Sequence, residues 1–236
     1  MKFNFIAGNY KAKSQYKNHF DKNDTLAVKG IAILLLLFHH LFLIKERLND
    51  NGIYIPDSEY KSLVFYIHSA RICVWIFVFL SAYGLTKKFA KTDNSLGFLR
   101  HFYFSSWWSL MSKWLIAYSL MAMIYKIWGG NLWQYYKYSK KNIVLDLIEW
   151  NDFFGVDRFF GSWYLCFAQI LILIIPVLFT IGKRYGLFSI LMIYVLIQFI
   201  PNGIVSTGGG DYLMYIPTAM AGVVFAQFLY LDKYVA

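Results

Sequence analysis

Two ionisable residues in one apolar segment are the first sign of chemistry in this sequence. Lys29 and His40 lie 11 positions apart, with an almost wholly apolar run between them. Eleven residues of α-helix turn about 1100°, or about 20° beyond three full turns, and rise roughly 16 Å. We therefore expect Lys29 and His40 to share one face, with His39 about 100° away. A cation and a deeper imidazole on one face could hold an anionic donor and accept a proton near neutral pH.

Spacing alone leaves simpler roles open for this pair. A histidine in a membrane helix can do no more than hydrogen-bond a neighbouring helix. A lysine at a helix end often serves only as a topology signal. Arg100, Lys87 and Lys88 could likewise serve only as topology signals. The arginine could also bind phosphate in a bidentate fork. For the two lysines, a topology signal is the favoured interpretation.

The composition predicts that helices in a membrane position these residues. Of 236 residues, 58% are hydrophobic, 21% are aromatic and 15% are charged, and the apolar residues form long blocks. Such blocks are typical of membrane-spanning helices, which need about 20 apolar residues. We expect an all-α, polytopic transmembrane helix bundle of about six spans. The expected spans are 26–44, 63–85, 102–125, 161–182, 185–200 and 212–231. Residues 1–25 would form a basic cytoplasmic leader, and residues 26–236 one transmembrane domain.

The charge pattern orients this expected bundle. The formal net charge is +10, from 23 Lys and Arg against 13 Asp and Glu. The leader, the segment around 87–100 and the Lys183-Arg184 pair are basic, which predicts that they and both termini are cytoplasmic. We therefore interpret the positive charge as topology and contact with anionic lipid, not as a nucleic-acid surface. The other loops are mixed or acidic, and we expect Asp146, Glu149, Asp152 and Asp157 to lie in a solvated outer loop.

Four segments resemble the membrane-bound acyltransferase-3 family. That family's mark is Arg or Lys, ten residues, then His, and Lys29 to His40 is similar to it. Residues 74–85 resemble its phenylalanine-rich stretch ending in Leu-Ser-Gly-Tyr, with Ala82 where Gly is usual. Residues 161–165 resemble its Trp-Tyr/Phe-Leu span, and residues 215–222 resemble a later span that ends in Phe and Gly. The four segments occur in consistent order from residue 26 onward.

The resemblance implies a cell-membrane enzyme. Members transfer acyl groups, commonly acetyl, from coenzyme A in the cytoplasm to hydroxyls of surface glycans or lipid-linked sugars. It implies that His40 is the catalytic base and that Lys29 is the cation beside the donor, acetyl-CoA. Departures from the family are the absence of a second Arg after Arg100, the absence of an acid in 166–169, and six expected spans where about ten are usual. We therefore expect a short form, a part of a longer protein or a protein that needs a partner.

The remaining candidates concern donor and acceptor contacts. Arg100, with Lys87 and Lys88, could bind the phosphates of the donor. His68 and Arg71 lie one helical turn apart near the outer end of the second expected span and could contact the acceptor. Trp163 could join them, although tryptophan is more often an interfacial anchor. We expect no metal, since Cys73 and Cys166 lie in apolar segments without ligand spacing.

A non-enzymatic role is the main alternative. A transporter, flippase or assembly subunit for surface polysaccharide could have the same composition. A transporter often carries internal repeats and pairs of Gly- or Pro-broken helices at matching positions. Neither pattern occurs in this sequence, which favours the enzyme.

Overall fold

The computed structural model describes residues 22–91, 96–137, 139–154, 159, 163–197, 199 and 212–228. Throughout these ranges the chain forms helices joined by turns and short loops, with no strand, which confirms the expected all-α class. The expected leader, 1–25, falls almost wholly outside them.

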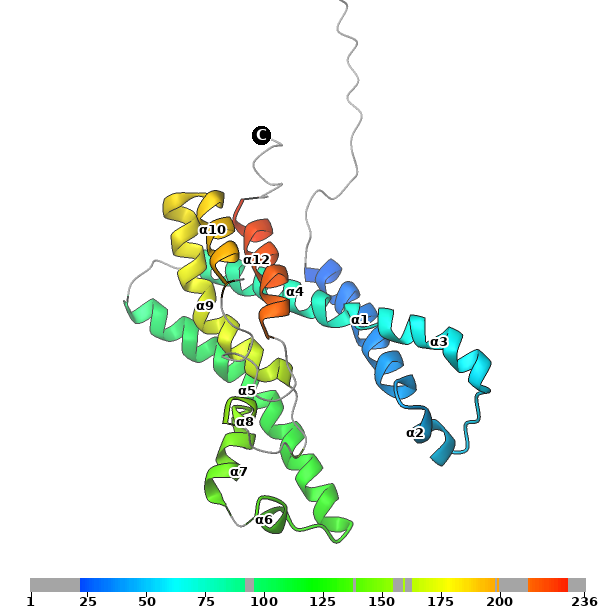
Figure 1. The fold of residues 1–236 in the computed structure, drawn as a ribbon. Coiled ribbons are helices and arrows are strands. Elements are labelled where there is room, and N and C mark those ends of the chain that lie inside the picture. Colours follow the sequence, from blue (N-terminus) through cyan, green and yellow to red (C-terminus); the bar gives the residue numbers. More distant parts are fainter. Residues whose placement is uncertain are drawn as a thin grey trace, which may run out of the picture.

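The helices follow one another along the chain as shown in Figure 1. They are α1 (Lys22–Phe42), α2 (Lys45–Asp50), α3 (Asp57–Ser69), α4 (Ile72–Ala90), α5 (Leu96–Ile127), α6 (Leu132–Tyr135), α7 (Lys140–Leu147), α8 (Asn151–Phe154), α9 (Trp163–Tyr185), α10 (Leu187–Ile197) and α12 (Tyr212–Gln227). The long helices α1, α4, α5 and α9 contain most of the apolar blocks, and the short helices α6 to α8 lie between α5 and α9.

Three segments are long and apolar enough to cross a membrane. They are Asn23–Phe42, Asp57–Ala90 and Trp163–Tyr185, and they match the first, second and fourth expected spans. Helix α5 contains the third expected span and has 32 residues, but polar side chains interrupt its apolar sequence. Helices α10 and α12, with 11 and 16 residues, are shorter than the roughly 20 residues of a full crossing.

The second expected span is not one uninterrupted α-helix. The chain turns at Ala70 and Arg71, between α3 and α4. Here Arg71 N bonds to His68 O at 3.1 Å, and Cys73 N bonds to Ala70 O at 3.1 Å. These bonds join residues three apart, as in a 3₁₀-helix. The backbone is therefore wound more tightly at Ala70 and Arg71 than in the α-helices on either side.

Helix α4 lies at the centre of the main core. It packs most extensively against α12, and also against α1 and α9 (Figure 1). A Cβ atom at Gly222 of α12 would lie 2.6 Å from Phe79 O of α4 and 3.0 Å from Ala82 Cβ. Small residues thus allow the two backbones to approach closely, as is common between membrane helices.

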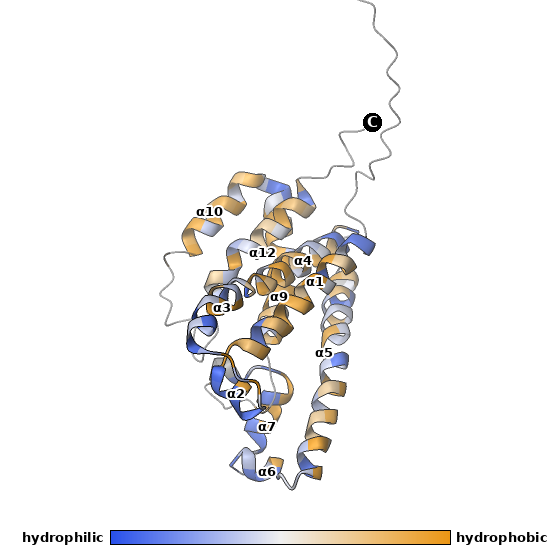
Figure 2. Ribbon diagram, turned by 90° about the vertical axis from the view of Figure 1, so that its right-hand side faces the viewer, coloured by the Kyte–Doolittle hydropathy of each residue, from blue (hydrophilic) through white to orange (hydrophobic). Residues whose placement is uncertain are grey.

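The outer surfaces of several helices are apolar. On α1 the exposed side chains include Ile31, Leu34 and Leu41, and on α10 they include Phe188 and Leu196. Figure 2 shows these helices largely in the hydrophobic colour. Large exposed apolar surfaces are unusual in a soluble protein. They suit contact with lipid chains.

Cysteine labelling can test the orientation predicted from the charge pattern. Ser58 and Lys91 are both exposed, so a difference between them reports the side of the membrane and not burial. We expect an impermeant thiol reagent to label Ser58→Cys in intact cells and to label Lys91→Cys only after permeabilisation. The native Cys73 and Cys166 are fully buried and give little background. Labelling of Lys91→Cys in intact cells would contradict the orientation.

Candidate functional site

A basic cavity lies where α1, α4, α5 and α9 meet. Its volume is about 550 Å³, and its polar lining consists of two lysines and three serines, with mostly apolar residues completing the walls. These polar residues, which define the lysine cavity, are Lys29, Lys113, Ser81, Ser106 and Ser109. Each of the four helices contributes to the wall.

The lysine cavity offers an environment that charged side chains need within a membrane. A cation in hydrocarbon is costly, so such residues usually face the interior of a bundle or a water-filled space. Lys29 comes from α1 and Lys113 from α5, and both line this one space. Two ammonium groups with nearby hydroxyls form a suitable site for an anion such as a phosphate.

Lys88 adjoins the lysine cavity through a serine. Its Nζ donates to Ser105 Oγ at 3.0 Å and to Ser106 Oγ at 2.8 Å, and Ser106 also lines the cavity. Lys87 instead lies over the Tyr83 ring, 5.6 Å from its centroid. Lys88 is therefore linked to the cavity wall through Ser106.

A hydrogen bond between α4 and α9 fixes one wall of the lysine cavity. The hydroxyls of Ser81 and Tyr164 lie 2.7 Å apart, and Tyr164 donates to Phe77 O at 3.2 Å. The bond joins the segments 74–85 and 161–165, which carry two of the family-like motifs. Trp163 lies elsewhere: its ring stacks on Tyr215, with centroids 4.8 Å apart, within the main core.

The adjacent histidines of α1 differ in their surroundings. His39 is buried, and its Nδ1 lies 2.8 Å from Ile67 O of α3. Because a carbonyl oxygen only accepts, Nδ1 is the donor in this bond. His40 is exposed and does not line the lysine cavity as Lys29 does.

A third histidine joins this pair at the contact between α1 and α3. The His39 ring centroid lies 5.3 Å from that of His40 and 6.5 Å from that of His68. His68 and Arg71 are both exposed, beside the turn between α3 and α4. Within the described ranges, no three His, Cys, Asp or Glu side chains are arranged to hold a metal ion.

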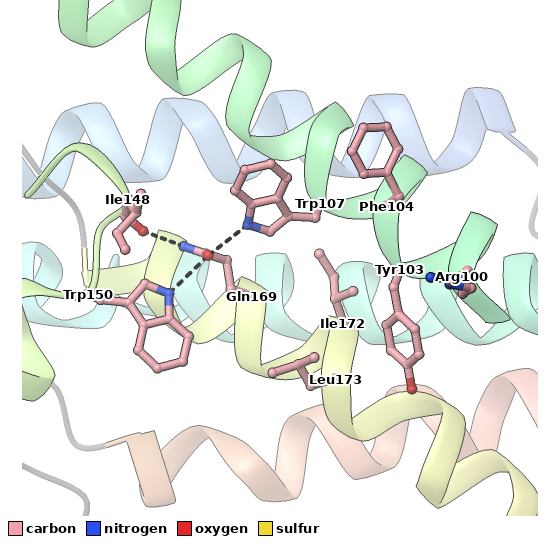
Figure 3. Close-up of a pocket in the computed structure, with 9 residues that line it drawn as sticks. All are labelled: Arg100, Tyr103, Phe104, Trp107, Ile148, Trp150, Gln169, Ile172 and Leu173. Atoms are coloured by element: carbon pink, nitrogen blue, oxygen red, sulfur yellow. Dashed lines mark hydrogen bonds between the residues drawn. The ribbon is translucent and has the colours of Figure 1, made fainter. Parts of the chain in front are cut away.

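Arg100 lines a second space, which we call the aromatic groove. Its volume is about 630 Å³, between α5, α9 and the turn after α7. Figure 3 shows its lining residues. They are Arg100, Tyr103, Phe104, Trp107, Ile148, Trp150, Gln169, Ile172 and Leu173. The structure therefore does not bring Arg100 into the lysine cavity.

The Gln169 side chain closes one end of the aromatic groove. Its Oε1 accepts from Trp107 Nε1 and from Trp150 Nε1, both at 3.0 Å, and its Nε2 donates to Ile148 O at 2.8 Å (Figure 3). In the sequence, Gln169 was noted only as one of residues 166–169, which contain no acid. The available signal was an amide in an otherwise apolar helix, which must find partners when it is buried.

Two acids of the loop between α5 and α9 are buried, so the expected solvated loop is wrong for them. Asp146 and Glu149 are 0% and 1% exposed. Asp146 accepts from the Tyr136 hydroxyl, from Asn151 Nδ2 at 2.8 Å and from Phe159 N at 3.2 Å. Burial, and then the hydrogen bond to Asp146, raise the pKa of Tyr136, so this phenol stays protonated and donates.

Asp146 is linked to α5 through Tyr136, and neither of the two buried acids is open to a ligand. Trp114 of α5 donates from Nε1 to Leu147 O at 2.9 Å, and the hydroxyl of Tyr118 lies 3.0 Å from that of Tyr136. The side chain of Asp152, and Asp157 as a whole, lie outside the described residues.

Removing the Gln169 amide should destabilise the loop and the aromatic groove. Gln169→Ala deletes three hydrogen bonds, each worth about 0.6 kcal/mol in a membrane protein, or about 2 kcal/mol together. Unfolding by denaturing detergent should show this loss. Gln134→Ala, at an exposed position on α6, is the matched control and should unfold like the wild type. Equal stability of both variants would contradict the role of Gln169.

Comparisons with protein-family models, with curated proteins and with solved structures give no match.

Proposed function

We propose that the chain is a membrane-bound O-acyltransferase. It transfers an acyl group, most simply acetyl, from coenzyme A to a hydroxyl of a surface polysaccharide or a lipid-linked sugar. The observation that carries this proposal is the composition of the lysine cavity. It combines Lys29, Ser81 and Leu165, each from a different segment that resembles the acyltransferase-3 family. A six-span bundle with both termini in the cytoplasm is part of the same proposal.

The lysine cavity supports binding of the donor phosphates. Coenzyme A carries several phosphates at its nucleotide end, and Lys29 and Lys113 supply two positive charges to one space. Lys88, held by Ser106 at the wall, adds a third nearby. Arg100 lines the aromatic groove instead, so we assign the donor phosphates to the lysines.

The separation of Lys29 from His40 suits such a donor. The thioester lies at the far end of the pantetheine arm from the nucleotide phosphates. His40 is 11 residues beyond Lys29, roughly 16 Å farther along α1. Phosphates near Lys29 and a thioester near His40 therefore fit one extended molecule that enters from the cytoplasmic end.

The proposed reaction needs one base. The His40 imidazole takes the proton of the acceptor hydroxyl as that oxygen attacks the thioester carbon. The new C–O bond forms, the C–S bond breaks, and the proton passes from the imidazolium to the departing sulfur of coenzyme A. No other co-reactant is required.

The exposed surface around His40 supports access for the acceptor. His40, His68 and Arg71 are all exposed, and the histidine rings neighbour one another through His39. We therefore assign His68 and Arg71 to acceptor contacts. Trp163 stacks on Tyr215 in the core, so we assign it to packing.

Neutralising the cavity lysines should weaken donor binding. We expect Lys29→Gln and Lys113→Gln each to raise the Kd for acetyl-CoA about two- to fivefold, since partly exposed ion pairs contribute modestly. High salt should shrink the difference by screening. Lys126→Gln, on the same helix as Lys113 but outside the lysine cavity, is the control. An equal loss in all three variants would show a general charge effect and contradict a specific cavity site.

Two adjacent substitutions test the proposed base. We expect His40→Ala to lower acetyl transfer in vesicles by about 10²- to 10⁴-fold, the usual contribution of a general base, while the protein stays in the membrane. His39→Ala should lower thermal stability, because it loses the bond to Ile67 O, yet retain transfer per folded molecule.

Other outcomes of this pair have clear meanings. An inactive His39→Ala with an active His40→Ala would show that the wrong imidazole had been chosen. Full acetyl transfer in both variants would contradict the proposed acyltransferase mechanism. It would favour a role as a transporter, flippase or assembly subunit.

A further inference from the structure

The aromatic groove lies on a different face of α5 from the lysine cavity. Arg100, Tyr103 and Trp107 line the groove and follow one another at helical spacings of three and four residues. Ser106 and Lys113 line the cavity and lie about 120° around the helix from the groove face, at 100° per residue. One helix thus contributes to two spaces, which share Ile172 of α9 as part of their walls.

The polar groups of the aromatic groove are unevenly distributed. At one end, the Gln169 amide and the Trp107 and Trp150 indoles satisfy one another. These groups therefore need no hydrogen bond from a ligand. At the other end lies Arg100, seven residues before Trp107, or roughly 10 Å along the helix. Among the residues that the structure describes, Arg100 forms no ion pair with a carboxylate.

The surroundings of the groove match a lipid environment. Phe104 and Leu173 line it and are 66% and 52% exposed, and the neighbouring Trp108 is 50% exposed. In a membrane protein such side chains face acyl chains. Arg100 is the fifth residue of α5, near the basic end of α4, which corresponds to the cytoplasmic headgroup level in the proposed orientation.

We propose that the aromatic groove binds one anionic phospholipid of the cytoplasmic leaflet. Arg100 holds the phosphate in a bidentate fork, and one acyl chain runs along Trp107 and Leu173 towards the closed Gln169 end. The volume of about 630 Å³ falls within the usual range of small-molecule sites, about 300–1,000 Å³. The choice of leaflet rests on the orientation proposed above, whereas the site itself does not depend on acyl transfer.

Photo-cross-linking can detect this lipid. The full chain is reconstituted in phosphatidylcholine vesicles with a trace of phosphatidylglycerol bearing a diazirine in one acyl chain, and mass spectrometry then locates the adducts. We expect adducts on residues 103–107 of α5 and 172–173 of α9. The same diazirine on phosphatidylcholine should give few adducts there.

Matched variants separate the charge of the site from its shape. Arg100→Gln should lower adduct yield about fivefold, as expected for one cation at a lipid phosphate, whereas Arg100→Lys should keep most of it. Lys91→Gln removes a charge near the end of α4 and should leave the yield near that of the wild type. Leu173→Trp fills the groove but keeps the charge of Arg100. This variant should abolish the adducts.

Three results would overturn the proposal. Equal labelling by both lipids, or an Arg100→Gln yield equal to that of the wild type, would mean that no anionic-lipid site exists. Suppression of adduct formation by acetyl-CoA added before irradiation, with weaker acetyl-CoA binding in Arg100→Gln, would assign the groove to the donor. Absence of acetyl transfer by the wild-type protein, with the adducts present, would refute only the acyltransferase proposal, so the two failures are distinguishable.

Discussion

The close approach of α4 and α12 at Gly222 is the constraint on which the other contacts depend. Any side chain at Gly222 would meet Phe79 O and the Ala82 side chain of α4, so the packing requires glycine. Helix α4 also packs on α1 and α9, and its Ser81 bonds to Tyr164 of α9. The position of α4 thereby fixes the distance between the helices that form the lysine cavity. Membrane helices lack a strong hydrophobic drive to associate, so such close packing and single hydrogen bonds have large structural consequences.

The cost of charge in hydrocarbon links this packing to the proposed chemistry. Lys29 and Lys113 come from distant parts of the chain and line the same polar space. A cavity with serine hydroxyls reduces the desolvation that each ammonium would otherwise suffer. The same arrangement suits an anion, so the feature that makes the lysines tolerable is also the basis of the proposed donor site. Arg100 belongs to a different face of the same helix and lines the aromatic groove, so α5 contributes to two neighbouring spaces.

The sequence predicted best what depends on one segment alone. The apolar blocks 26–44 and 161–182 correspond closely to α1 and α9, because length and hydropathy determine a membrane helix. The turn at Ala70 and Arg71 was missed, since no Gly or Pro marks it.

Helical spacing predicts which residues share a face, but not which face a neighbour covers. The burial of His39 depends on the Ile67 carbonyl of α3, and that contact was not evident from α1 alone. The burial of Asp146 and the bonds of Gln169 likewise depend on the packing of residues 128–154 against α5 and α9, which no local pattern encodes.

Chemical footprinting of lysines tests the central claim, that the lysine cavity holds the donor phosphates, without any substitution. The reconstituted protein is treated briefly with an amine-acylating reagent, with and without coenzyme A, and the modification of each lysine is measured by mass spectrometry. The account predicts that coenzyme A protects Lys29 and Lys113 and leaves Lys91 and Lys126, which do not line the cavity, unchanged. Unaltered modification of Lys29 and Lys113 at saturating coenzyme A would contradict it.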